Sequence, residues 1–598
     1  MLCFYKFYMR YFIFYRVQIF SLFAIILACF IVPSSPLFST NPASISYQCS
    51  QIKFEYGGFS GDLPSLVPLE RASLSLSCTD GPILMSRLFA GLETPLILNL
   101  EDFHRMGELA THYLRSLGLE GLVVFPDPNQ IDPVSGRDLR LNGEGEIRFL
   151  IWVSRLQAIE LEDGGVNQSI FTRLQSIAEK SVEDKSPHPL TSSDLRFWNR
   201  LGRAPTRSSQ VVLSPGEKPG QVVAVVKLRP KVNPQFSIMA SNSGTPTTGE
   251  WILGASYTNE QLSGADDRLG LSYLSSDTGE RRAYSVSYRR PVLFPDILEL
   301  GIGLGYSNYD ASSFAVTKID FAGETRSADL SVRWNPLGTE FEKYSFSFEA
   351  GVRGERVQAS NSLIAGEADA TMVTPSVSVR LSTKGEYLRT ESRLSLRGNV
   401  QSISTSNQSL LGGVNTKDRF ERLSIDYLES FKLGKWLSDQ FPDSFSESWS
   451  GQILLTRARA DFALRDQRHL PQHQFIAGGT GSVRGYPESP IAGDSGYSIS
   501  IEHRIPLPVS LLGEGNALRT TLIPFVDWGE TFVTDPLFYE SDQSILGAGV
   551  GLEIKAPRGG SARIDFARPL REIINNGTIL EGTRSGDHRV HASVNWKF

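Results

Sequence analysis

The chain has 598 residues, which is longer than one ordinary domain. This length predicts two or more folded units. Its 59 basic and 65 acidic residues give a formal net charge of -6 at pH 7. This balance argues against a nucleic-acid-binding protein, which would need a basic surplus or a clustered basic face.

The N-terminus joins basic residues to an apolar segment. Lys6, Arg10 and Arg16 precede an apolar stretch at 19–32, shorter than the roughly 20 apolar residues of a spanning helix. This pattern is typical of an export signal, with a membrane anchor as the alternative. We therefore assign residues 1–40 to a signal peptide and residues 41–71 to a linker.

Only Cys49 and Cys78 follow the signal peptide. An oxidising compartment permits a disulfide between them, but spacing alone does not reveal whether their geometry allows it. A bonded pair and two unlinked thiols both remain open.

Residues 72–232 carry two successive patterns of strands and helices. In residues 99–121, apolar side chains recur at steps of three and four, and Asn99 is placed to cap the resulting helix. The pattern predicts two α+β units, at 72–153 and 154–232. The predicted elements are a strand at 72–78, a helix at 99–121, strands at 122–125 and within 146–161, helices at 167–181 and 192–202, and two strands within 209–230.

From about residue 234 the hydrophobic period becomes two. Tyr344, Phe346 and Phe348 alternate with polar neighbours that include Glu349. A soluble core could not bury such charges unpaired, whereas a membrane barrel turns one face to lipid and the other to a wet lumen. A soluble all-β protein would show the same alternation locally. At roughly 22 residues per strand and connection, residues 233–598 predict an outer-membrane β-barrel of about sixteen antiparallel strands.

The last residues, "VHASVNWKF", alternate in the same way. Trp596 and the terminal Phe598 lie on the apolar face. A strand that ends in a C-terminal Phe resembles the final strand of bacterial outer-membrane barrels, which the insertion machinery recognises.

Three motifs occur in a fixed order along the chain. The motif residues are Pro215, Gly216, Pro219 and Gly220 of an L-x-P-G-x-x-P-G turn; Val483, Arg484, Gly485 and Tyr486 of "GGTGSVRGY"; and Phe525, Asp527 and Gly529 of "PFVDWGE". Together they resemble those of TpsB transporters of two-partner secretion, the ShlB/FhaC/HecB family, over residues 72–598. The resemblance implies that the two α+β units are POTRA domains.

The alternation places Phe525 and Asp527 on the lumen side of one strand, and Glu502 and Arg504 on the lumen side of another. The resemblance implies that Arg484, at the tip of a surface loop, folds into the barrel and pairs with Asp527. The glycines around Arg484 permit the tight backbone turns that this requires.

The resemblance implies an outer-membrane pore that secretes a haemolysin- or adhesin-type exoprotein without nucleotide hydrolysis. Its POTRA domains would lie in the periplasm, and a client strand would add to an exposed sheet edge. An outer-membrane protein assembly or insertion factor of the same superfamily is the alternative. A bare diffusion porin would have no use for POTRA domains. We expect a monomer in contact with lipid and no nucleic-acid partner.

No enzyme motif and no cofactor or metal site is predicted. His469 and His473 stand four apart, but Pro471 between them is incompatible with a helical ligand pair, so we interpret them as solvated loop or wall residues. Two departures from the family pattern stand out. Residues 133–145 form an apparent insertion in the first unit, and the Pro and Gly spacing of 39–68 disfavours a long plug helix.

Overall fold

The computed structural model describes residues 46–598 apart from short gaps. The gaps are 58–62, 80, 134, 142–143, 184–186, 203–205, 219, 232, 294–296, 315–318, 337–343, 362–365, 412–414, 418, 442–449, 466–467, 508–517, 538–539, 558 and 576–577. The predicted signal peptide therefore lies outside the described residues. Among the helices described, none is long and apolar enough to cross a membrane.

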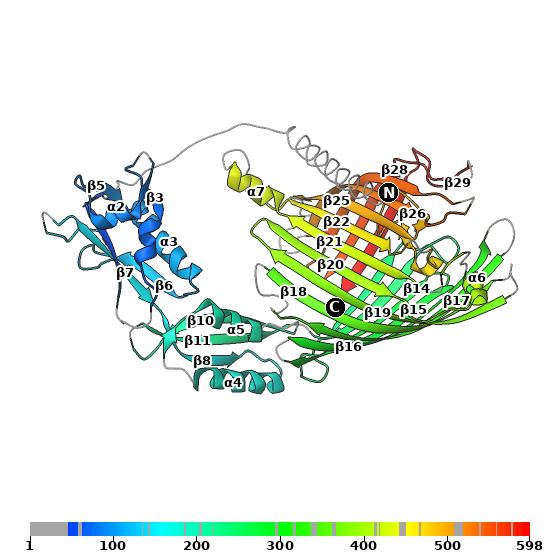
Figure 1. Cartoon of the computed structure of the whole chain (residues 1–598), viewed down its shortest axis with the longest axis horizontal. Coiled ribbons are helices and arrows are strands. Elements are labelled where there is room, and N and C mark those ends of the chain that lie inside the picture. Colours follow the sequence, from blue (N-terminus) through cyan, green and yellow to red (C-terminus); the bar gives the residue numbers. More distant parts are fainter. Residues whose placement is uncertain are drawn as a thin grey trace.

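The first α+β unit contains a mixed three-stranded sheet with helices beside it (Figure 1). In the order β2-β7-β6, the central strand is parallel to β2 and antiparallel to β6, and β1 pairs separately with β5. The elements are β1 Ser46–Cys49, β2 Gln51–Tyr56, β3 Ser73–Ser75, β4 Pro82–Leu84, α2 Met85–Ala90, β5 Leu96–Asn99, α3 Leu100–Ser116, β6 Leu122–Pro126 and β7 Glu146–Val153.

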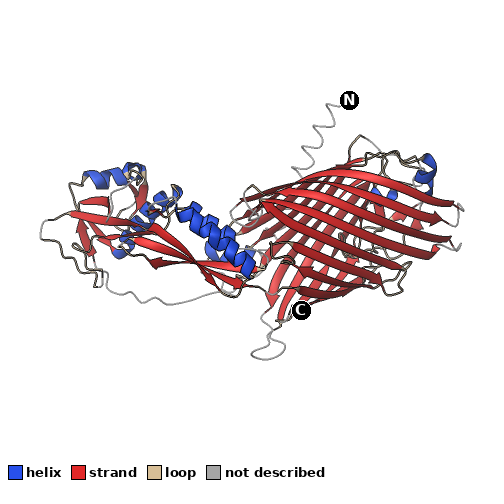
Figure 2. Ribbon diagram, turned by 90° about the horizontal axis from the view of Figure 1, so that it is seen from below, coloured by secondary structure: helices blue, strands red, loops and turns tan. Residues whose placement is uncertain are grey.

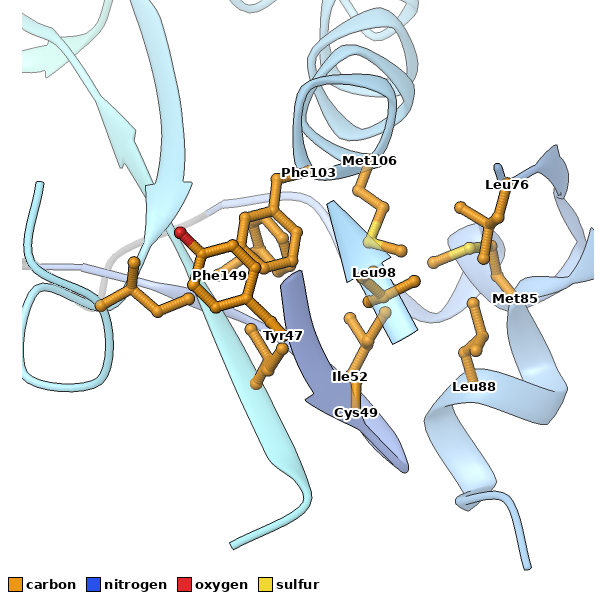
Figure 3. Close-up of a cluster of buried hydrophobic side chains, with 12 residues drawn as sticks. Tyr47, Cys49, Ile52, Leu76, Met85, Leu88, Leu98, Phe103, Met106 and Phe149 are labelled. Atoms are coloured by element: carbon orange, nitrogen blue, oxygen red, sulfur yellow. The ribbon is translucent and has the colours of Figure 1, made fainter. Parts of the chain in front are cut away.

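Helix α3 follows the predicted pattern closely. The Asn99 side chain accepts a hydrogen bond from the Asp102 amide, and the Asp102 carboxylate accepts one from the Asn99 amide, which completes a capping box. Phe103 and Met106 on its apolar face enter a core that also contains Tyr47 and Phe149 (Figure 3). The Phe103 ring stacks on Tyr47 at 4.7 Å and meets Phe149 edge to face at 5.6 Å between centroids.

The predicted linker at 41–71 is wrong from residue 46 onward, because β1 and β2 belong to the first unit. Tyr47, Cys49 and Ile52 are at most 1 % exposed in its core. The Pro and Gly spacing of this segment disfavours a helix, but β1 and β2 each show the period-two alternation that is the signal of a half-buried strand. Cys49 is buried and Cys78 is exposed, and both are free thiols.

The second α+β unit has a four-stranded sheet in the order β10-β11-β8-β9, covered by two helices. Apart from the short β9, its elements agree with the predicted ones. They are β8 Arg155–Asp163, α4 Gln168–Glu183, β9 His188–Pro189, α5 Ser192–Gly202, β10 Arg207–Pro215 and β11 Gln221–Pro230. Strand β8 directly follows β7, so Ser154 is the bend between the two units. Ile170, Leu174 and Trp198 from the helices pack on Val226 and Leu228 of the sheet.

A closed barrel of sixteen strands forms the remainder of the described chain, which confirms the predicted fold (Figure 2). Every neighbouring pair of strands is antiparallel, and β31 pairs back with β12. The strands are β12 Gln235–Ser241, β13 Ile252–Asn259, β14 Arg268–Ser276, β15 Arg281–Leu293, β16 Leu298–Phe314, β17 Ile319–Trp334, β18 Tyr344–Asn361, β19 Gly366–Lys384, β20 Leu388–Gly398, β21 Glu421–Phe431, β22 Ile453–Ala463, β25 Ser495–Leu507, β26 Arg519–Phe532, β27 Gln543–Lys555, β28 Gly560–Pro569 and β31 Arg589–Lys597.

The outer wall carries the apolar half of each alternating strand. Leu300, Ile302 and Leu304 of β16 are 43 %, 55 % and 55 % exposed, whereas the positions that alternate with them hold Glu299 and glycines and are less exposed. An exposed apolar belt around a closed barrel matches a lipid surface, because closure leaves no unpaired sheet edge in the hydrocarbon.

An ion pair joins the second unit to the base of the barrel. Arg207 at the start of β10 is 2 % exposed and donates from both terminal nitrogens to the Asp266 carboxylate, which lies in the turn between β13 and β14. Ser169 of α4 also donates to the carbonyl oxygen of Gly264 in the same turn, at 3.2 Å. The second unit is therefore attached to the barrel at two points.

Shorter elements decorate these units. They are η1 Val67–Arg71, α6 Thr405–Leu410, α7 Leu433–Gln440, η3 Pro471–His473, β23 Phe475–Ala477, β24 Ile491–Gly493, β29 Ile574–Asn575 and β30 Thr578–Ile579.

Candidate functional site: a loop tip held inside the barrel

The candidate site lies on the loop between β22 and β25, residues 464–494. These are the eleventh and twelfth strands of the barrel, so the loop emerges at the end opposite the α+β units. Strands β23 and β24 form a short hairpin in this loop, with Phe475 opposite Gly493 and Ala477 opposite Ile491.

The turn beyond this hairpin is shaped by glycines and by two side chains. Gly478 and Gly479 have φ values of +111° and +85°, a region that residues with a side chain rarely adopt. The Ser482 hydroxyl accepts from the Gly478 amide at 2.8 Å, and the Glu488 carboxylate accepts from the Thr480 amide at 2.8 Å. The loop therefore has a defined shape before it contacts the wall.

Arg484 forms a bidentate ion pair with Asp527 on the barrel wall. Its Nε donates to Asp527 Oδ2 at 2.7 Å and its Nη2 to Oδ1 at 2.8 Å, while the Arg484 amide also donates to Oδ2 at 3.0 Å. The Arg484 side chain is 6 % exposed and that of Asp527 is 0 % exposed. This geometry gives direction as well as attraction, so it fixes the position of the loop tip.

Two more carboxylates surround the Arg484 guanidinium. Glu502 of β25 accepts from Nη1 at 2.9 Å, and Asp565 of β28 lies 3.4 Å from the same nitrogen. Arg563 balances the excess negative charge, because it donates to Glu502 at 2.7 Å and to Asp565 at 3.0 Å. The Phe525 ring lies under the guanidinium at 3.5 Å from its centroid.

The two residues after Arg484 extend the attachment. The Gly485 amide donates to His591 Nε2 at 3.1 Å, which links the loop to the last strand of the barrel. The Tyr486 hydroxyl donates to the carbonyl oxygen of Arg571 at 2.7 Å, and its ring is fully buried. Val483 is also fully buried in the same apolar cluster.

Glycines on the wall make room for the loop. A Cβ atom at Gly547 would lie 2.0 Å from the Arg484 carbonyl oxygen, and one at Gly549 would lie 2.7 Å from the Phe525 ring. A Cβ atom at Gly529 would stand 3.0 Å from Val483. A side chain at Gly547 would clash with the loop in this position. The wall surface is therefore complementary in shape to the loop.

The structure brings all seven residues of the two predicted motifs together, along with Glu502. Arg504 lies further along β25, where it donates to Glu553 at 2.7 Å and lies 3.5 Å from Glu502. Sequence reasoning missed Asp565, His591 and Gly547. Gly547, Gly549 and Gly551 occupy successive inward positions of one strand. This pattern indicates that another backbone segment can approach that wall closely.

The predicted turn of the second unit lies between β10 and β11. The Gly216 amide donates to the carbonyl oxygen of Gln221 at 2.8 Å, and Gly220 has a φ of +80°. Pro215 ends β10, whereas Pro219 lies outside the described residues. The turn therefore belongs to the second α+β unit, whereas the loop tip contacts the barrel wall.

The end of the chain closes the barrel. Trp596 pairs in register with Ile238 of β12, and the Phe598 amide donates to the Phe236 carbonyl oxygen at 2.8 Å. The Phe598 ring also lies 5.9 Å from the Phe236 ring.

His469 and His473, predicted to be solvated loop or wall residues, both lie in the loop, but His469 is only 1 % exposed, so the prediction of solvation is wrong for it. Both rings pack against Phe420, and the His473 ring lies 4.2 Å from it between centroids. The turn at Pro471 carries them into the packed base of the loop. No cluster of metal-ligating side chains occurs among the residues that the structure describes.

Together, the closed barrel, the α+β units at one end and the inserted loop tip define an outer-membrane transporter of the barrel type. The Omp85 superfamily domain matches residues 261–581, more than half of the chain. The chain therefore belongs to the Omp85 superfamily and is a bacterial outer-membrane protein.

Solved structures with the same fold include two proteins named CdiB. The one from Escherichia coli aligns with a TM-score of 0.59 at 16 % identity, over 95 % of this chain and 93 % of the other. The one from Acinetobacter baumannii aligns with a TM-score of 0.57 at 14 % identity, over 98 % and 97 % of the two chains.

A third structure, BamA from Haemophilus ducreyi lacking POTRA domains 1–3, has a TM-score of 0.47 at 14 % identity and covers 85 % of this chain and 95 % of its own. At this score the match carries no argument. No curated protein sequence matches the chain.

Proposed function

We propose that this Omp85 transporter secretes a partner exoprotein of the haemolysin or adhesin type across the outer membrane. The two α+β units act as POTRA domains, at 46–153 and 154–232, and receive the unfolded client in the periplasm. The client then passes through the barrel without nucleotide hydrolysis and folds outside. The observation that carries this proposal is the attachment of the Arg484 loop tip to the lumen wall.

The attachment of the loop tip to the wall is better explained by a role in gating the pore than by a role in stabilising the fold. A buried Arg–carboxylate pair loses hydration that its attraction repays only in part, so its value lies in fixing a position. The tip occupies the lumen through which a client would pass, and a charged pair can exchange its partner for water when the loop moves. We infer that Arg484 holds the resting position of the loop and that secretion requires its release or adjustment.

Only two α+β units precede the barrel in the described chain, and the second is anchored directly to its base through Arg207 and Asp266. A short, attached pair of units suits delivery of one client into the pore. A free sheet edge is present on the first unit at β6, where an extended client segment could add as a further strand.

Membrane-protein assembly is the second candidate, and the closing seam is the observation that favours it. The pairing of β12 with β31 runs only from Ser237 opposite Lys597 to Ser241 opposite Ser593. In contrast, β18 pairs with β19 from Tyr344 to Asn361. A short seam needs fewer hydrogen bonds broken before a client strand can pair with its edges.

Secretion can be tested by expressing the protein with large exoproteins encoded beside it and measuring each exoprotein in the medium. Arg484→Ala should reduce secretion at least tenfold while the barrel remains inserted and heat-modifiable. Arg465→Ala is the matched control, because Arg465 lies in the same loop, is 69 % exposed and pairs only at the rim with Glu421.

Two outcomes would oppose the proposal. Normal secretion by Arg484→Ala would remove the role of the attached loop. If no exoprotein reached the medium, and depletion of the protein reduced other outer-membrane barrels, then the assembly function would replace secretion.

A further inference from the structure

The lumen wall opposite the attached loop carries arginines that face each other across strands. Arg380 of β19 is directly opposite Arg393 of β20, and Arg397 of β20 is directly opposite Arg422 of β21. Side chains in such positions start about 5 Å apart, and like charges there repel each other. Two adjacent pairs of this kind need a counter-charge.

The neighbouring carboxylates supply that charge only in part. Asp461 forms ion pairs with both Arg422, at 3.0 Å, and Arg459, at 3.3 Å. Within the described part of the chain, no carboxylate oxygen lies within 4.0 Å of a guanidinium nitrogen of Arg380 or Arg393. The Arg393 guanidinium reaches only the Ser378 hydroxyl, at 3.4 Å.

The wall near Arg484 shows the opposite arrangement. There, Glu502 Oε1 accepts from both Arg484 and Arg563, so this oxygen is already engaged where Arg457 lies 3.7 Å away. The basic excess therefore lies on the wall formed by β19 to β22, and Glu502 on the adjacent β25 compensates the arginines of β22 only in part.

A cavity of about 780 Å³ lies between these two walls. On the basic side it is lined by Arg380, Arg393, Arg457 and Arg459, with Glu391 and Asp426 as the carboxylates. Four arginines against two carboxylates give this side a net positive charge. Arg380, Arg457 and Arg459 are exposed to the cavity, so a solute there can reach them.

We propose that Arg380 and Arg393, supported by Arg457 and Arg459, form a carboxylate-binding site on the lumen wall. The planar guanidinium presents a fork of donors that matches a carboxylate, and two guanidiniums on neighbouring strands can share one such group. Acidic side chains of a polypeptide in the lumen are the ligands of this site. This ligand assignment rests on the proposed secretion route through the lumen, whereas the triglutamate assays test the site itself.

The same charge predicts the ion selectivity of the pore. Purified protein in a planar bilayer with a KCl gradient should give a reversal potential of the sign for anion preference. Triglutamate should reduce the current at concentrations where triglutamine does not. In the Arg380→Gln/Arg393→Gln variant, the triglutamate concentration for half-block should rise at least about tenfold. The loss of each ion pair weakens triglutamate binding by a factor of about ten or more.

Three variants make the assignment specific. Arg380→Lys/Arg393→Lys should keep the anion preference but bind triglutamate more weakly, since Lys lacks the fork. Arg115→Gln, a change of the same kind on the exposed surface of the first unit, should behave as wild type. If chloride selectivity persists but triglutamate has no effect at any concentration, the site is a general anion site and the carboxylate assignment is overturned.

A thermal measurement tests the site when the pore is closed. Bound triglutamate relieves the repulsion between the arginines, so it should raise the unfolding midpoint of the detergent-solubilised wild-type barrel at constant ionic strength. The double Gln variant should have lost this increase while remaining folded. Wild-type cation preference, or an unchanged response to triglutamate in both assays after the double substitution, would overturn the proposal.

Discussion

Gly547→Ala provides a direct test of the fit between the loop tip and the wall. The new Cβ would lie 2.0 Å from the Arg484 carbonyl oxygen. A tolerable contact requires about 3 Å, so the loop backbone must move away by about 1 Å. A movement of this size would lengthen the 2.7 Å bond between Arg484 Nε and Asp527 Oδ2 to about 3.7 Å, which is no longer a hydrogen bond.

The energetic consequence follows from the bonds lost. A hydrogen bond to a charged group contributes about 1.5–3 kcal/mol, so the loss of one or two of them should favour the released loop by about 1.5–6 kcal/mol. This corresponds to a rise of about 10- to 20,000-fold in the ratio of released to attached loop, because 1.4 kcal/mol is a factor of ten.

Trypsin can report this ratio, since cleavage after Arg484 requires a side chain that is only 6 % exposed in the attached loop. Mass spectrometry of the released peptides should show cleavage at Arg484 much earlier in Gly547→Ala than in wild type. Gly481→Ala is the control, because a Cβ there meets nothing within 4 Å. If Gly547→Ala were as resistant at Arg484 as the wild type, the steric argument would be refuted.

Four further predictions concern other parts of the molecule. Arg207→Ala should broaden the distribution of distances between spin labels on the second unit and the barrel, because it removes the buried ion pair with Asp266. Arg229→Ala, on the exposed end of β11, should leave this distribution unchanged. Burial raises the pKa of Cys49 to about 11, so maleimide at pH 8 should label Cys78 and spare Cys49 until the first unit unfolds. The same shift means that stability is unaffected by Cys49 below the unfolded pKa of 9.0 and falls as pH rises from there to about 11, which denaturation at several pH values can check. Deletion of Phe598 should lower the yield of folded barrel in the outer membrane, since it removes the bond to Phe236 that ends the seam, and equal heat-modifiable yields with and without Phe598 would contradict this.

The barrel could be predicted because its physics is local. Each strand shows its two faces within a few residues, as at Tyr344, Phe346 and Phe348, so no knowledge of partners is needed. Helix α3 was equally accessible, since Asn99 and Asp102 form its cap within four residues. Strands β1 and β2 were missed because their alternation is broken at Ser50 between Cys49 and Gln51.

The pairing of Arg484 with Asp527 was available only through the resemblance of two motifs that stand 43 residues apart. Strand parity showed that Asp527 faces the lumen, but parity cannot tell which loop reaches it. Asp565 and His591 were missed for a related reason, because their position beside Arg484 follows from the closure of the barrel. Like-charge pairs such as Arg380 and Arg393 likewise depend on register, which the sequence alone leaves open.

The attachments of the loop tip couple its position to the closing seam. Asp527 lies on β26, Asp565 on β28, and His591 on β31, the strand that pairs with β12. If opening of the seam also shifts β31 relative to β28, the Gly485 amide loses His591 while Arg484 keeps Asp527, so the tip cannot satisfy both contacts at once. Opening of the seam and release of the loop are therefore energetically linked, and a variant that frees the loop should also make the edge of β31 more accessible to exchange.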